Sequence, residues 1–354
     1  MSDIRRHIRA SLFITNQALV GADVRKAFED QLKLCRAVRD GGWHSVIVGQ
    51  HFLSDTFTHL QPIPFLARLA AESGELRLGI GISLLALLNP VEIAETYASL
   101  DVISGGRLIF GVGLGYRDVE YAAFGVNTAE RVERFEHNLE VVLSLWRGDI
   151  VDVDLPWCHL ERQHLALRPL QQPRPPLWMA ANSDAAVKRA ARLADSWFIN
   201  PHATRTTIAR QLAIYRQARL DAGKLTDPPE LPLMREVFCA PTRAEALALA
   251  GPYLAQKYGV YASWGQDKVL PDHDSFIRPL DDLTSDRFVL GSPEECLSEL
   301  LDWRDQLGVD HFVIRTDWAG MPIEVAMGSL RLLTDEVLPI LCEVPYKRSA
   351  TSSR

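Results

Sequence analysis

The chain has 354 residues, of which 47% are hydrophobic and 23% are charged, with 22 glycines and 20 prolines. Such a composition is that of a folded globular protein and excludes a disordered, fibrous or low-complexity chain. The net charge of -7 provides no positive field that would attract nucleic acid or an anionic membrane. We therefore expect a small molecule as the partner, and neither nucleic acid nor a membrane.

The N-terminus and the cysteines indicate a cytoplasmic protein. The first apolar run is too short for a secretory signal, and no stretch approaches the ~18 consecutive apolar residues of a membrane span. The cysteines contain no C-x-x-C pair, which fits a reducing compartment. They are Cys35, Cys158, Cys239, Cys296 and Cys342.

Apolar runs of strand length alternate along the chain with longer stretches of helical period. The predicted strands are 8–14, 44–50, 76–83, 107–113, 176–181, 195–200, 232–239 and 310–316. The predicted helices are 24–39, 90–103, 128–147, 184–194, 203–222, 242–257, 293–307 and 322–341. This alternation is typical of βα units around a parallel sheet. It favours an α/β fold with one (β/α)₈ TIM-barrel domain over residues 1–354, and an open doubly wound sheet is the alternative.

Two stretches interrupt the alternation and are predicted to be insertions in the barrel. Residues 148–175 contain two short alternating runs and a proline-rich end, which favour a surface hairpin. Residues 258–290 show no sustained period and exceed the usual length of a connection. We expect the second stretch to be an irregular loop that closes over the active site.

The segment 101–126, DVISGGRLIFGVGLGYRDVEYAAFGV, carries the densest chemical signal. Residues 104–106 (SGG) are predicted to end a helix, because glycine readily adopts the left-handed cap conformation. Gly111-x-Gly113-x-Gly115 then ends a strand, where the glycines would let a ligand approach the backbone. Tight packing at the rim of a barrel explains these glycines equally well, and their spacing is not that of a dinucleotide-binding loop.

This segment, with its acidic residue before Phe124-Gly125, resembles the fourth βα unit of the luciferase-like monooxygenases. Other segments resemble the same family in the same order along the chain. They are 49–52 (GQHF, with Gln50 where the family has Glu), 79–107 (with Asn89-Pro90 before a helix), 176–200 (PLWMAANSDAAVKRAARLADSWFIN) and 308–322 (GVDHFVIRTDWAGMP). The resemblance covers residues 8–341.

The resemblance implies that the barrel binds FMN, or the 8-hydroxy-5-deazaflavin coenzyme factor 420, at the carboxyl ends of its strands. Barrel enzymes have their active sites at that end. The resemblance also implies a non-proline cis peptide bond beneath the flavin ring, at Gly81-Ile82 or Ile82-Ser83. The residues that it implies in cofactor binding are Ile82, Ser83, Gly113, Leu114, Tyr116, Ala181, Asn182 and Ser183.

Asn182-Ser183-Asp184 begins the helix after the fifth strand, where unpaired backbone N–H groups and the helix dipole favour an anion. The resemblance implies that Ser183 contacts the flavin phosphate, and a simple N-cap role is the alternative. The carboxylate of Asp184 opposes a phosphate because it occupies the same field. Arg117, just beyond the fourth strand, is expected to supply a compensating positive charge.

His51 is the residue expected to transfer protons. It follows the second strand, imidazole titrates near neutrality, and the resemblance implies a catalytic histidine here. A histidine bonded to the backbone at the rim is the alternative. The nearby His44 and His59 form no usual metal-binding motif, so no metal site is expected. Residues after the eighth strand are expected to line the substrate pocket, namely Arg315, Thr316 and Trp318.

The predicted function is that of a flavin-dependent monooxygenase that uses reduced FMN and O₂ to oxygenate a small organic substrate. The resemblance also implies a separate flavin reductase and a homo-oligomer. Three alternatives are a deazaflavin-dependent hydride-transfer oxidoreductase, a flavin-binding protein without catalysis and, least favoured by the residues, a metal-dependent barrel hydrolase. The identity of the substrate does not follow from the sequence.

Overall fold

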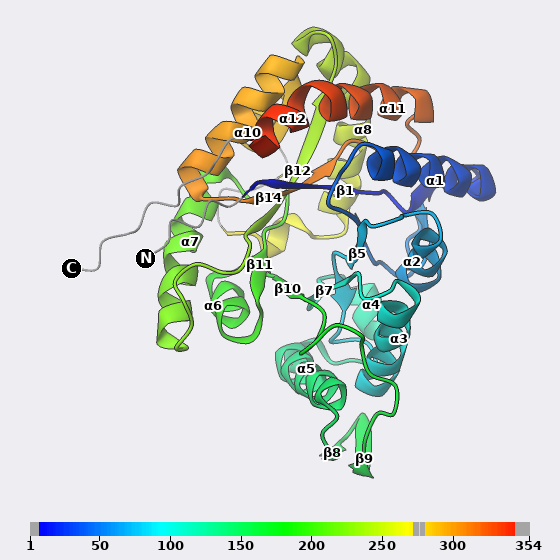
Figure 1. Cartoon of the computed structure of the whole chain (residues 1–354), viewed down its shortest axis with the longest axis vertical. Coiled ribbons are helices and arrows are strands. Elements are labelled where there is room, and N and C mark those ends of the chain that lie inside the picture. Colours follow the sequence, from blue (N-terminus) through cyan, green and yellow to red (C-terminus); the bar gives the residue numbers. More distant parts are fainter. Residues whose placement is uncertain (1–6, 272–275, 277–279, 344–354) are drawn as a thin grey trace.

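A curled sheet of parallel strands lies at the centre of the computed structural model (Figure 1). The structure describes residues 7–271, 276 and 280–343. The main strands are β1 (Arg9–Phe13), β3 (Ser45–Val48), β5 (Arg77–Ile80), β7 (Leu108–Gly113), β10 (Leu177–Ala180), β11 (Ser196–Phe198), β12 (Pro232–Cys239) and β14 (His311–Arg315). Two shorter strands extend the sheet, β6 (Ser83–Leu84) beside β7 and β13 (Phe288–Gly291) beside β12.

The order of the strands in the sheet follows their order in the chain. The pairing runs from β1 through β3, β5, β7 and β10 to β11, and β1 also pairs with the last strand, β14. On its other side β14 pairs with β12. A single parallel bridge joins Leu233 of β12 to Ile199, the residue just after β11. A doubly wound sheet does not pair its first strand with its last, so this alternative is excluded.

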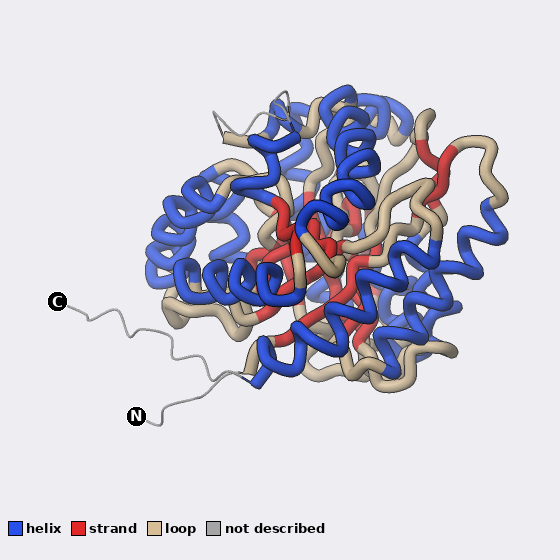
Figure 2. The backbone as a smooth tube through the Cα atoms, turned by 90° about the horizontal axis from the view of Figure 1, so that it is seen from above, coloured by secondary structure: helices blue, strands red, loops and turns tan. Residues whose placement is uncertain are grey.

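Helices surround the sheet, as the view from above shows (Figure 2). They are α1 (Val24–Asp40), α2 (Pro62–Ala70), α3 (Pro90–Ile103), α4 (Asp118–Ala123), α5 (Arg131–Arg147), α6 (Asp184–Leu193), α7 (Arg205–Asp221), α8 (Arg243–Ser263), α9 (Leu280–Arg287), α10 (Pro293–Leu307), α11 (Ile323–Leu332) and α12 (Leu338–Glu343). A π-helical turn, Leu333–Val337, joins α11 to α12, so these elements occupy the single predicted helix 322–341. The short helices α2, α4 and α9 were not predicted from the sequence.

Local capping signals set the ends of the best-predicted helices. The side chain of Asn89 accepts a hydrogen bond from the Val91 N–H, and Pro90 starts α3. Ser292 and Glu295 form a reciprocal capping box at the start of α10. Such caps satisfy N–H groups that have no partner inside the helix.

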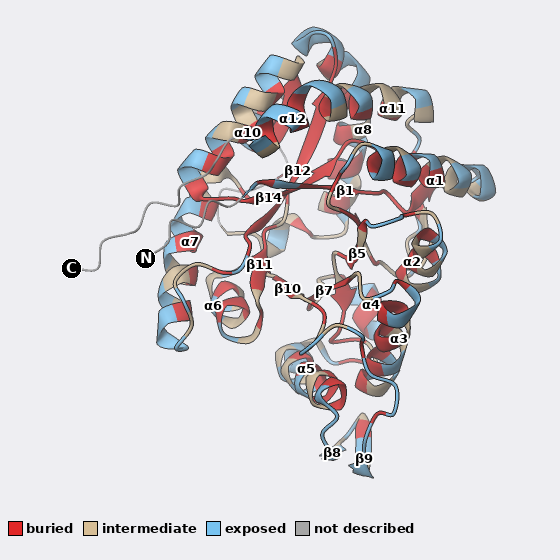
Figure 3. Ribbon diagram, in the orientation of Figure 1, coloured by how far each residue is buried: buried red, intermediate tan, exposed pale blue. Residues whose placement is uncertain are grey.

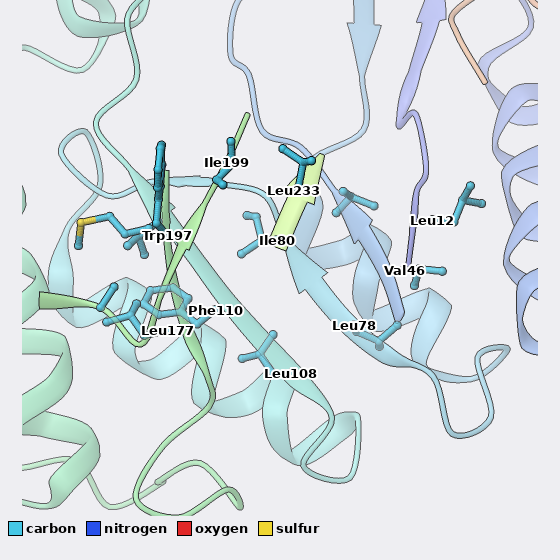
Figure 4. Close-up of a cluster of buried hydrophobic side chains, with 14 of the residues drawn as sticks. Leu12, Val46, Leu78, Ile80, Leu108, Phe110, Leu177, Trp197, Ile199 and Leu233 are labelled. Atoms are coloured by element: carbon cyan, nitrogen blue, oxygen red, sulfur yellow. The ribbon is translucent and has the colours of Figure 1, made fainter. Parts of the chain in front are cut away.

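The strands of the sheet are largely buried (Figure 3). Because side chains alternate along a strand, the sheet has two apolar faces. The outward side chains pack against the helices, and burial of each contributes about 1.5–3 kcal/mol. Those labelled in Figure 4 are Leu12, Val46, Leu78, Ile80, Leu108, Phe110, Leu177, Trp197, Ile199 and Leu233. The inward side chains meet in one separate cluster of Phe13, Ile47, Ile109, Trp178, Phe198, Met234 and Val313. Because seven strands contribute to this inner cluster, the sheet must curl tightly around it.

The first predicted insertion is a hairpin, as expected. Strands β8 (Val151–Leu155) and β9 (Cys158–Gln163) pair antiparallel and project at the bottom of Figure 1. A second antiparallel pair was not predicted. It joins β2 (Gln17–Leu19) to β4 (Phe57–His59) at the carboxyl end of the sheet.

The prediction of an irregular loop over 258–290 is wrong for much of its length. Helix α8 continues to Ser263, a 3-10 turn covers Asp267–Val269, and α9 and β13 end the stretch. Helix α8 extends further because Tyr258 and Tyr261 bury their rings in a second apolar cluster. Residues 272–275 and 277–279 of the predicted lid lie outside the described part of the chain.

No helix in the described ranges combines the length and the apolar character that crossing a bilayer requires.

A buried polar network lies at the amino ends of β1, β3 and β14. The Ser11 hydroxyl lies 2.6 Å from His311 Nε2 and also contacts the Ser45 hydroxyl. His311 Nδ1 lies 2.9 Å from Glu230 Oε2, whose other oxygen accepts a 2.8 Å bond from Trp178 Nε1. Serine, histidine and carboxylate follow one another as in hydrolase triads. Ser11, Ser45 and His311 are fully buried and line none of the large cavity described below, so we assign the network to stability.

Glu230→Gln is expected to destabilise the fold by about 1–3 kcal/mol near neutral pH, because it removes a charged acceptor of buried hydrogen bonds. Burial alone would raise the pKa of Glu230, but the bond and charge of His311 lower it below the usual 4.5. A lowered pKa stabilises the folded state above about pH 4.5, and this stabilisation is lost as the pH falls further. The difference from the unsubstituted protein should therefore shrink in acid.

Urea unfolding at several pH values measures this difference. Glu140→Gln is the control, because the Glu140 side chain is 70% exposed. A Glu230→Gln effect that is the same at pH 7 and pH 3.5 would contradict the assignment.

Candidate active site

One large cavity, of about 1160 Å³, opens at the carboxyl ends of the strands. Its walls come from segments that follow β1, β3, β5, β7, β10 and β11, from residues of β12 and β14, and from α8 and the turn after it. Eight of the nine predicted site residues line it. They are His51, Ile82, Gly113, Leu114, Tyr116, Ala181, Asn182 and Ser183.

Ser83, the ninth, is not part of the cavity wall. It is fully buried in β6, where it pairs with Val112 of β7. Side chains alternate along a strand, so the residue after Ile82 faces away from the cavity. The side chain of Ser83 is therefore not placed to contact a ligand in this cavity, unlike the other eight predicted residues.

Glycines shape the wall between β5 and β7. The peptide bond between Gly81 and Ile82 is cis, at one of the two positions that the resemblance implied. A Cβ atom at Gly113 would overlap the side chain of Ile82, and one at Gly81 would lie 2.8 Å from Phe198. Because Gly81 and Gly113 have no side chains, Ile82 can pack closely against β7. Its side chain gives this part of the cavity wall an apolar surface.

Two helix N-termini meet at the next part of the wall. Ser183 caps α6 by accepting a 3.3 Å hydrogen bond from the Ala186 N–H, and Thr204 caps α7 in the same way. Both caps line the cavity. The positive ends of two helix dipoles thus face the same space, an arrangement that favours an anionic group.

The charge of Asp184 is balanced by Arg210 of α7. The two guanidinium nitrogens of Arg210 lie 2.6 and 2.9 Å from the carboxylate oxygens, and the hydrogen bond from Arg210 lowers the pKa of Asp184. This compensation was predicted from Arg117, and the prediction is wrong, because Arg210 supplies it. Arg117 lies on the other side of the cavity wall, where it donates to the carbonyls of Phe52 and Leu53.

His51 is held by a buried carboxylate that the sequence analysis missed. His51 Nδ1 lies 3.1 Å from Glu120 Oε1, which also accepts from the Phe52 N–H and from Arg117. Because a carboxylate only accepts, Nδ1 must carry the proton and Nε2 is left to accept one. Glu120 is fully buried, whereas the His51 side chain remains 13% exposed towards the cavity.

Aromatic rings enclose His51. The rings of Trp264, His59, Tyr116 and Tyr261 have their centres between 5.3 and 6.0 Å from its own. Burial, followed by the charge of His51, lowers the pKa of His59 to about 3, so His59 stays neutral. The Tyr116 hydroxyl has no hydrogen-bond partner among the described residues. Burial raises its pKa well above 10, so it is available as a donor to a ligand.

Of the pocket residues predicted after the eighth strand, only Arg315 lines the cavity. The Thr316 hydroxyl bonds to Ser329 of α11, and Trp318 packs in the second apolar cluster. Lys257 of α8 was missed and also lines the cavity. In the sequence, Lys257 is a cation in the interior of a largely apolar helix. Burial lowers its pKa to about 8.

His44 and His59 do not form a metal site with each other. Within the described ranges, no group of three or more histidine, cysteine, aspartate or glutamate side chains is arranged to hold a metal ion. His44 instead packs against His311 at the opposite end of the sheet, with ring centres 4.9 Å apart.

The sequence matches the family described as luciferase-like monooxygenase over residues 8–311. Among curated proteins, it is similar to the oxygenase component of the flavin-dependent trigonelline monooxygenase of Acinetobacter baylyi. The two are 26% identical over 363 aligned residues, which cover 98% of this chain and 99% of that protein.

Solved structures share the fold. Monooxygenase RslO1 from Streptomyces bottropensis superposes with a TM-score of 0.81 at 23% identity, covering 94% of this chain and 99% of that one. An F420-dependent secondary alcohol dehydrogenase, in complex with an F420-acetone adduct, superposes with a TM-score of 0.76 at 18% identity. That match covers 95% of this chain and 99% of the dehydrogenase.

Glu120→Ala is expected to change the tautomer of His51. In the unsubstituted protein, Glu120 should hold neutral His51 with its proton on Nδ1, and loss of the acceptor should populate the Nε2–H form. Nitrogen NMR of labelled histidine at mildly alkaline pH distinguishes the two tautomers, and circular dichroism checks that the variant is folded. An Nε2–H tautomer of His51 already dominant in the unsubstituted protein would refute this arrangement.

Proposed function

Because the chain belongs to the luciferase-like monooxygenase family, we propose that it is a flavin-dependent monooxygenase that uses reduced FMN and O₂ to oxygenate a small organic substrate. The observation that carries the proposal is the single cavity that brings together the glycine-backed surface at Ile82, the helix N-terminus at Ser183 and the carboxylate-held His51. These parts suit a flat ring system, an anionic tail and a reactive edge.

We also propose that the curled sheet acts as one closed (β/α)₈ barrel domain with insertions at 148–175 and 258–290. The pairing of β1 with β14 and the bridge from Ile199 to Leu233 support this proposal. The contact that closes the barrel, between β12 and the chain after β11, consists of this one bridge. The carboxyl half of β12 pairs with β13 instead of β11. This leaves room at that side of the cavity mouth.

The flavin ring is proposed to lie against Ile82, Gly113 and Leu114, where the wall is apolar and free of projecting side chains. Its phosphate would bind at the N-terminus of α6, near Ala181, Asn182 and Ser183. Asn182 is already oriented by a 2.6 Å hydrogen bond from the Asn200 amide. When bound, the reduced flavin supplies the electrons that activate O₂.

His51 is the proposed proton-transfer group. Its Nε2 can accept or return a proton at the cavity surface, while Glu120 keeps the ring in one orientation and stabilises the positive charge when it forms. The aromatic rings around it exclude water, which protects reactive species from hydrolysis. Without Glu120, His51 could carry its proton on Nε2 instead of Nδ1. Its Nε2 could then no longer accept a proton from the cavity.

A separate flavin reductase is proposed as the source of reduced FMN, since the similar trigonelline enzyme is named as an oxygenase component. We likewise propose a cytoplasmic homo-oligomer.

An anaerobic titration tests the proposed function. Reduced FMN should bind the purified protein, and O₂ should then be consumed when a flavin reductase and NADH are supplied. Binding of factor 420 but not of FMN would favour the deazaflavin oxidoreductase. Tight FMN binding with no change in the reaction of the flavin with O₂ would favour a binding protein without catalysis. Failure to bind either cofactor would refute the proposal.

Ser183→Ala separates a phosphate contact from a simple cap. Loss of the cap alone should lower stability by about 1 kcal/mol without changing ligand preference. If Ser183 also contacts the phosphate, the preference for FMN over riboflavin, which lacks the phosphate, should fall roughly tenfold. Thr242→Ala removes the corresponding cap of α8 away from the cavity and is the matched control. An unchanged FMN-to-riboflavin ratio in Ser183→Ala would assign Ser183 to capping only.

A further inference from the structure

The charged groups that line the cavity are unevenly distributed. Among its acidic residues, Asp118 and Asp286 are exposed at the rim, and Asp184 is paired with Arg210. The buried charges at the inner end are instead positive. They are Arg315, 2% exposed, and Lys257, 3% exposed.

Arg315 faces the cavity because of its position in β14. His311, Val313 and Arg315 alternate with outward-facing residues and therefore share the inner face of the strand. His311 belongs to the polar network at the amino end and Val313 to the inner apolar cluster. Arg315 is the next inward side chain, so it lies where the packed interior ends and the cavity begins.

Lys257 has its own counter-charge. Its ammonium group bonds to Glu236 Oε1, and Glu236 Oε2 accepts a 2.8 Å hydrogen bond from Trp318 Nε1. Both oxygens of the carboxylate are thus in use, and the pair is buried at 4% and 0% side-chain exposure. This pair is close to neutral as a unit.

No carboxylate of the described residues bonds to Arg315. Burial alone would lower the pKa of Arg315, but the charges of Glu236, Tyr261 and Asp317 at longer range raise it. Its Nε donates to the carbonyl of Asp317 at 3.2 Å, and one terminal nitrogen lies 3.5 Å from the Gln17 amide oxygen. Within the described ranges, no carboxylate oxygen forms an ion pair with its guanidinium. The Asp317 carboxylate accepts from the Thr15 N–H and lines a separate small hollow. A buried guanidinium with donors to spare and a cavity before it is a binding site for a planar anion.

A continuous polar wall joins Arg315 to His51. The Gln17 side chain, beside Arg315, donates to the Tyr261 hydroxyl and contacts His59. The ring of Tyr261 in turn lies 6.0 Å from that of His51. A ligand anchored at Arg315 would therefore lie along this wall, between Tyr261 and the surface at Ile82.

We propose that the substrate is a small organic carboxylate, bound through its carboxylate group by Arg315 at the inner end of the cavity. The inference rests on the proposed function, since it assigns the part of the same cavity that the flavin would leave free. The aromatic wall would hold the organic part next to His51. The carboxylate would then lie at Arg315, the organic part along the wall at Tyr261, and the reacting atoms next to His51.

Matched acids and amides test the proposal without knowledge of the natural substrate. The probes are benzoate, phenylacetate and pyridine-3-carboxylate, each compared with its primary amide by calorimetric titration of the full chain. We expect the acids to bind at least about tenfold more tightly than the amides, because the charged hydrogen bonds are lost in the amides. Arg315→Gln should abolish the preference for acids, and Arg315→Lys should retain part of it.

Arg331→Gln is the control, since Arg331 is exposed on α11 and bonds only to its own helix in the described structure. Circular dichroism and FMN affinity are measured for each variant, so a misfolded protein is recognised. Equal binding of acids and amides, no binding of any acid, or an acid preference that survives in Arg315→Gln would each overturn the inference. Acid binding without FMN binding would leave the inference intact and refute the proposed function instead.

Discussion

The structure depends on the alternation of side chains along parallel strands that all point the same way. This constraint places every carboxyl end at one edge and sorts the interior into layers. In β14, His311, Val313 and Arg315 occupy the polar network, the apolar middle and the cavity in turn. A slip of one residue in the register would turn all three outward. The position of the site therefore follows from the register of the sheet.

Much of the fold could be predicted because its signals are local. Helices α3 and α10 have the predicted limits, since a capping side chain and proline mark their starts and glycines follow their ends. The eight main strands were found from apolar runs bounded by turn residues, and β12 has the predicted limits. The extension of α8 to Ser263 could not be found in this way. It depends on apolar contacts of Tyr258 and Tyr261 with residues distant in the sequence.

The candidate site was predictable where chain order alone determines position. Residues that follow a strand lie near the carboxyl edge, and the resemblance to the luciferase-like family selected His51, Gly113 and Ser183 among them. The partner of His51 was not, because Glu120 meets it only when α4 folds back over the loop after β3. Trp318 also follows a strand and was predicted to line the substrate pocket. Its indole N–H instead donates to Glu236, and its ring does not line the cavity.

Polar groups lie at both ends of the interior, and those at the two ends meet different surroundings. At the amino end, Glu230 accepts from His311, Trp178 and Arg9, so the charge buried there is well compensated. At the carboxyl end, the Tyr116 hydroxyl and His202 Nδ1 have no partner among the described residues, and no carboxylate of these residues bonds to Arg315. An unpaired buried polar group costs about 1–3 kcal/mol, and an unpaired charge costs more. An unpaired buried group is expected at a binding site, because a bound ligand can form the missing hydrogen bond and remove this free-energy cost. The unpaired groups that line the cavity, Tyr116 and His202, are therefore positions where a ligand could remove such a cost.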